Sequence, residues 1–120
     1  KAELFRGPLG WLLRRLGGRP VNRAAPAGIV EQAAAQVRRS ERMWFVLAPE
    51  GTRRRVEQWK SGFWKIARRA DVPVFCAWFH YPERTIGLGP LVEPTDDFAA
   101  DMARVRAIYR PYQGKNRGTV

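Results

Sequence analysis

The sequence has 120 residues, a length that allows one domain or a part of one. Apolar residues make up 45% of it, with five tryptophans and six phenylalanines, so a packed core is expected rather than a disordered chain. The net charge of +11 predicts a surface that attracts anions, and nucleic acid, anionic lipid headgroups and phosphorylated small molecules all remain candidate partners.

The single cysteine, Cys76, excludes an internal disulfide and a cysteine-based zinc site. It lies in the apolar run 74–79, which predicts a buried, unreactive thiol and fits a reducing compartment. No signal peptide is visible, and no apolar run reaches the roughly 20 residues that span a bilayer. The chain starts at Lys1 inside a helical pattern, and we expect it to be a segment of a longer protein.

The apolar periodicity of the first half predicts two helices and a strand. A helix is expected over residues 4–16, where leucines recur at helical spacing. Trp11 and the arginines that flank it fit a helix on a membrane surface, and packing of the same helix against a sheet is the simpler alternative. A second helix is expected over about residues 28–41, followed by a buried strand over 43–48.

The second half continues the alternation of helices and strands. A helix is expected over about 62–70, a strand from Val72 to Phe79, strand ends and turns from His80 to Pro94, and a last helix over 95–110. Alternating strands and helices imply βα units. We therefore expect an α/β fold with a mainly parallel sheet flanked by helices.

The most informative motif is Pro49-Glu50-Gly51-Thr52-Arg53, which directly follows the predicted strand over 43–48. A helical pattern begins near Gly62. A charged turn between a strand and a helix places polar groups at the carboxyl end of a sheet, where α/β proteins bind their ligands. The motif therefore predicts a ligand site at this turn.

Four blocks of the chain resemble the glycerolipid acyltransferases of the lysophosphatidate acyltransferase type. In chain order they are Lys1-Ala2-Glu3-Leu4 with Gly10-Trp11, Gly17-Gly18-Arg19-Pro20-Val21-Asn22-Arg23, Pro49-Glu50-Gly51-Thr52-Arg53 and Val72-Pro73-Val74. The third block matches the family's signature at every position. Cys76 stands where the family usually has a second proline, a change that should affect packing and not chemistry.

The resemblance implies that residues 1–110 are the carboxyl-terminal portion of one acyltransferase domain, followed by a basic tail over 111–120. It implies transfer of an acyl group from acyl-CoA or acyl carrier protein to a lysophospholipid, first of all 1-acylglycerol-3-phosphate, in phospholipid biosynthesis. The thioester is a co-substrate, and neither a bound cofactor nor a metal is expected. The implied location is the cytoplasmic face of the membrane, with anionic lipid as a further partner and no specific nucleic acid.

The resemblance also implies an acceptor-binding site. Its expected residues are Arg23, Glu50, Gly51, Thr52, Arg53 and Lys60. An arginine binds a phosphate through two parallel hydrogen bonds, a glycine lets the backbone approach the ligand, and a lysine near a helix start adds positive charge. Glu50 is expected to orient the arginines, because nearby cations favour its charged form. The simpler alternative for Arg53 is a solvated member of the run 53–55.

In the family, acyl transfer depends on a histidine in a His-x4-Asp motif, the base that deprotonates the acceptor hydroxyl. The only histidine of this sequence is His80, which has no aspartate five positions on, so a packing or surface role is expected for it. We expect the chain to be inactive alone, with its catalytic motif upstream of Lys1. A catalytically inactive lipid-phosphate-binding relative is the first alternative. A nucleic-acid-binding module is the second, disfavoured because the aromatic residues fall on stripes that look buried.

Overall fold

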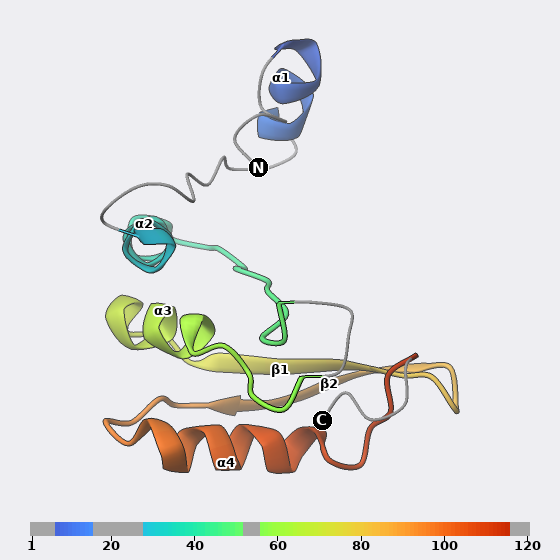
Figure 1. Ribbon diagram of the computed structural model, residues 1–120. Coiled ribbons are helices and arrows are strands. Elements are labelled where there is room, and N and C mark those ends of the chain that lie inside the picture. The colour runs from blue at the N-terminus through green and yellow to red at the C-terminus, as the bar shows by residue number, and fades with distance from the viewer. Residues whose placement is uncertain (1–6, 16–27, 52–55, 116–120) are drawn as a thin grey trace.

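The computed structural model describes residues 7–15, 28–51 and 56–115, and Figure 1 shows the elements that they form. The elements are, in chain order, α1 (Gly7–Arg15), α2 (Gly28–Arg38), α3 (Gly62–Ala70), β1 (Val74–His80), β2 (Thr85–Val92) and α4 (Phe98–Tyr109). All four predicted helices are observed, and α3 has the predicted bounds. The hairpin of β1 and β2 runs between α3 on one side and α4 on the other (Figure 1).

The described strands form an antiparallel sheet, and the predicted mainly parallel sheet is wrong for this part of the chain. The four residues 81–84 connect β1 to β2, and the backbone N–H of Arg84 donates to the carbonyl of Tyr81 at 3.2 Å. A connection this short can join only antiparallel neighbours, since a parallel pair needs a crossover of a dozen or more residues. The fold of the described residues is therefore α/β with a two-stranded hairpin.

The strand β2 lies where strand ends and turns were predicted. Its glycines are not turn residues: they make room for the Trp78 ring of β1, because a Cβ atom on Gly87 or Gly89 would lie 2.2–2.4 Å from that ring. Pro90 lies at an irregularity of the pairing, where Phe75 faces Leu91 but Ala77 faces Leu88. Glycine at a close approach and proline at a bulge are both compatible with a strand.

The segment 43–48 is not a strand in the structure, contrary to the prediction. It has no regular secondary structure, and Trp44 and Val46 are 77% and 88% exposed. Phe45 packs against the buried side chains that α2 and α3 share, and the centroid of the Trp44 ring lies 5.5 Å from that of Phe75. An apolar run becomes a buried strand only where a neighbouring strand supplies hydrogen bonds, and no strand in the described ranges pairs with this one.

Two clusters form the core of the described residues. The first joins α2 to α3 and consists of Ala33, Ala34, Ile66 and Ala70. The second lies between the hairpin and α4 and consists of Trp59, Cys76, Val92 and Val105. The second and third of the predicted helices supply the first cluster. The second cluster contains the predicted buried thiol, since Cys76 is fully buried.

The carboxylate of Asp101 ties α4 to α3. It accepts hydrogen bonds from the indole N–H of Trp64 at 2.8 Å, from the backbone N–H and hydroxyl of Thr95, and from the guanidinium of Arg104. Its residue is only 2% exposed. Burial by itself would raise the pKa of Asp101, but these hydrogen bonds lower that pKa well below its usual range. Asp101 is therefore a charged, fully partnered group within the core.

Helix α1 stands apart from the other elements in Figure 1. Leu9, Trp11 and Leu12 are 54%, 63% and 45% exposed, and the guanidinium of Arg15 lies over the Trp11 ring. The simpler expectation, that this helix packs its leucines against a sheet, is not met within the described residues. These three apolar side chains of α1 therefore remain exposed to solvent.

Candidate functional site

The turn at residues 48–51 follows from its local sequence. Proline at the second position and glycine at the fourth are favoured in β-turns. The backbone N–H of Gly51 donates to the carbonyl of Ala48 at 3.1 Å and closes the turn. Gly51 has φ of +63°, a left-handed conformation that residues with a Cβ atom rarely adopt. The glycine of the motif is thus required by the backbone itself.

Lys60 lies directly against this turn. Its backbone N–H donates to the carbonyl of Pro49 at 2.9 Å. Its side chain lies beside Gly51, where a Cβ atom would be 3.0 Å from both the Nζ and Cε atoms of Lys60. Lys60 is exposed, so its ammonium group is available to a ligand from solvent. The structure therefore brings the positive charge and the glycine of the turn together across eight intervening residues.

The amino end of α3 begins two residues after Lys60. Its N-cap residue, Ser61, makes no side-chain capping bond, and the first turn of the helix carries no acidic residue. Uncapped N–H groups and the helix dipole give such an end a partial positive charge. Lys60 and the amino end of α3 thus both contribute positive charge next to the turn in the sequence.

Glu50 is half-buried, and its carboxylate affects the pKa of Tyr109 in α4. Burial is the main reason that the pKa of Tyr109 rises to about 12, with smaller contributions from Cys76 and from the carboxylate of Glu50. Tyr109 is therefore protonated at neutral pH. Its hydroxyl accepts from the backbone N–H of Ala77 and donates to the carbonyl of the same residue, at 3.2 and 3.1 Å.

Three of the predicted site residues lie in the described part of the chain, namely Glu50, Gly51 and Lys60, and the structure brings them together. The other three, Arg23, Thr52 and Arg53, lie outside the described residues. Nothing in the structure tests their role, and it stays a prediction.

Sequence reasoning missed Trp59, a buried residue that directly precedes Lys60. Trp59 is 7% exposed, and its ring meets that of Tyr109 edge-on at a centroid distance of 5.3 Å. Its indole N–H is buried without a hydrogen-bond partner among the described residues. The only signal in the sequence is a large apolar residue next to a predicted site lysine, within a stretch that otherwise predicts a loop.

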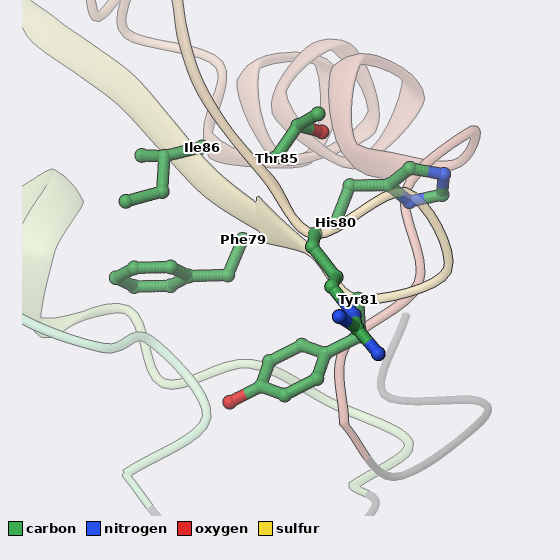
Figure 2. Close-up of a pocket in the computed structure, with 6 residues that line it drawn as sticks. Phe79, His80, Tyr81, Thr85 and Ile86 are labelled. Carbon is green, nitrogen blue, oxygen red and sulfur yellow. The ribbon is translucent and has the colours of Figure 1, made fainter.

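His80 is the last residue of β1 and contacts the residues that follow α4. Its Nδ1 accepts a hydrogen bond from the backbone N–H of Gln113 at 3.0 Å, and its ring contacts Tyr112. In Figure 2 the His80 ring points away from Phe79 and Ile86, which line the same shallow apolar pocket. This arrangement fits the packing or surface role expected for His80.

No three His, Cys, Asp or Glu side chains in the described ranges gather closely enough to hold a metal ion. None of the described helices combines the length and the apolar character that crossing a membrane requires.

These features define an α/β protein with a positively charged turn placed before a helix. A family model described as Acyltransferase matches residues 1–80, which include this turn and extend to the end of β1. The chain therefore belongs to the acyltransferase family, as its four sequence blocks indicate, and the general chemistry of the family is acyl transfer. Comparison with curated proteins and with solved structures gives no significant match.

Proposed function

We propose that the turn at residues 48–51 and Lys60 bind the phosphate of a lysophospholipid, first of all 1-acylglycerol-3-phosphate. The observation that carries this proposal is the Lys60 ammonium group beside Gly51, with the uncapped start of α3 two residues further along the chain. A phosphate dianion is stabilised by a lysine and by helix N–H groups together. Arg23, Thr52 and Arg53 complete the proposed site, two as guanidinium donors and one as a hydroxyl donor.

In the proposed reaction this chain supplies the acceptor-binding part of an O-acyltransferase. The free hydroxyl of the acceptor attacks the thioester carbonyl of acyl-CoA or acyl carrier protein, so that an ester C–O bond forms and the C–S bond breaks. The proton of the hydroxyl leaves through a general base, and the thiol is released. Binding of the phosphate fixes the position of that hydroxyl and lowers the entropic barrier to attack.

The test is calorimetric titration of the 120-residue chain with lysophosphatidate, using monoacylglycerol as the ligand that lacks the phosphate. Lys60→Ala should weaken lysophosphatidate binding about tenfold or more, because it removes a charge-assisted hydrogen bond. Lys65→Ala is the matched control, since Lys65 is an exposed lysine within α3 itself, and it should change the affinity less than about threefold. Equal losses from both variants would show only a general attraction of anions.

Arg53→Ala and Arg23→Ala test the other half of the proposed site. Each should weaken lysophosphatidate binding about tenfold or more and leave monoacylglycerol unaffected. Unchanged affinity in both variants would remove these arginines from the site. The protein encoded by the longest open reading frame that contains this chain can be assayed for transfer of a labelled acyl group. If it carries a His-x4-Asp motif before Lys1, transfer identifies an active enzyme, and binding without transfer identifies a relative that only binds lipid.

We also propose that the protein acts at the cytoplasmic face of an anionic membrane. The exposed Leu9, Trp11 and Leu12 of α1, followed by two arginines, support this location. Co-sedimentation with phosphatidylglycerol vesicles should exceed that with phosphatidylcholine vesicles, and Trp11→Ala should reduce it. Equal co-sedimentation with both kinds of vesicle would contradict the electrostatic part of the proposal.

A further inference from the structure

Arg106, a residue of α4, contacts the segment that leads to Lys60. Its Nη2 atom donates to the backbone carbonyl of Glu57 at 2.8 Å. Its guanidinium carbon also lies 5.9 Å from the centre of the Trp59 ring. A guanidinium that is hydrogen-bonded to a carbonyl and placed over an aromatic ring restrains both groups. Arg106 therefore restrains residues 57–59 at two points.

Trp59 is also held by a second residue of α4, Tyr109. It is almost fully buried between α4 and β1, and Tyr109 meets its ring edge-on. Tyr109 is itself bound to both backbone groups of Ala77 in β1. Because buried side chains are close-packed, the Trp59 ring cannot shift without displacing α4 or β1. The position of Trp59 thus depends on α4.

The residue after Trp59 is Lys60, whose position is fixed in turn. One peptide bond separates the restrained tryptophan from the lysine, and the Lys60 N–H bonds to Pro49. The chain of contacts therefore runs from Arg106 through Trp59 to Lys60 and the turn. Every contact in it is made by described residues.

We propose that Arg106 is a positioning residue for anion binding: by holding Glu57 and Trp59, it keeps the Lys60 ammonium group beside the turn and thereby sets the affinity for phosphate. This inference rests on the proposed function. Helix α4 (Phe98–Tyr109) lies beyond residues 1–80, the part that the family model matches. The inference thus gives a helix outside the matched residues a role in acceptor binding.

The test is calorimetric titration of the 120-residue chain with inorganic phosphate and with lysophosphatidate, at a temperature where circular dichroism shows every variant folded. Arg106→Ala should lower the affinity for both ligands about fivefold. Arg106→Lys, which can still reach the Glu57 carbonyl, should recover part of that affinity. Arg110→Ala is the matched control, because it removes the same charge one turn further along the chain. It should leave the affinity within about twofold.

A double-mutant cycle separates positioning from a general loss of stability. In the Lys60→Ala background, Arg106→Ala should no longer change the phosphate affinity, whereas its effect on the thermal unfolding midpoint should persist. An undiminished effect on affinity in that background would overturn the inference. If wild type binds phosphate through Lys60 and Arg106→Ala has no effect, the inference fails and the proposed function stands. If wild type binds neither ligand, both fail.

Discussion

The Cα of Gly51 faces the side chain of Lys60 so closely that a methyl group at Gly51 would lie 3.0 Å from the Lys60 Nζ atom. Gly51 also has a positive φ of 63°. Gly51→Ala should therefore displace the lysine, strain the turn by about 1–2 kcal/mol, and weaken lysophosphatidate binding. Urea unfolding and calorimetric titration measure the two effects separately.

Gly62→Ala is the control for this substitution. Gly62 is the first residue of α3, has no positive φ, and has open space where a Cβ atom would lie. Alanine there should raise the free energy of unfolding by up to about 1 kcal/mol, so this variant is the control for the effect on stability. A Gly51→Ala variant as stable and as tight-binding as wild type would contradict the described turn.

Gly87→Ala should destabilise the hairpin. The added Cβ atom would lie 2.2 Å from the Trp78 ring, so the tryptophan must leave its place beside Tyr112. Overpacking of this kind costs about 1–3 kcal/mol, which thermal unfolding measures. Leu88 is 71% exposed on the opposite face of the same strand, so Leu88→Ala should cost less than about 1 kcal/mol. Equal effects of the two changes would contradict the described faces of β2.

Asp101→Asn should destabilise the protein by about 2–4 kcal/mol. The change puts an amide, which can accept fewer hydrogen bonds, where a buried carboxylate has Trp64, Thr95 and Arg104 as donors. Asp96→Asn is the control. Asp96 pairs with Arg68 at the surface and its side chain is 92% exposed, so its loss should cost less than about 1 kcal/mol.

The same carboxylate predicts a dependence of stability on pH. Because the pKa of Asp101 is lower in the folded state than the ordinary value near 4, its contribution is complete above about pH 4. The contribution is lost as the pH falls below that value, since the unfolded chain then binds the proton first. Urea unfolding at pH 7 and pH 3 should show the difference between wild type and Asp101→Asn shrinking in acid. A constant difference would exclude Asp101 as the titrating group.

Cys76 should react slowly with thiol reagents in the native protein. Its side chain is fully buried and burial raises the pKa of its thiol, with a smaller opposing effect from Tyr109. Labelling by iodoacetamide at pH 8 should therefore follow the unfolding equilibrium and become rapid in urea. Rapid labelling without denaturant would show that the second core cluster opens more readily than its packing implies.

Much of the fold was predictable because helices depend on local periodicity. The stripe of Ile66, Ala67 and Ala70 defines α3 within its own sequence, and Ala33 and Ala34 do the same for α2. The strand β2 was missed for the opposite reason. Gly87 and Gly89 resemble turn residues until the position of Trp78, nine or more residues away in sequence, shows what they accommodate.

By itself the sequence determined the acyltransferase family, through the blocks around Pro49–Arg53, and it determined the helices and the glycine that the turn requires. Only the tertiary structure decided that the described strands pair antiparallel, that segment 43–48 pairs with neither of them, and that Arg106 contacts Glu57 and Trp59 just before Lys60. The physical reason is one of range. Turn geometry and helical periodicity are set by neighbours along the chain, whereas strand partners and packing contacts depend on where the whole backbone returns in space.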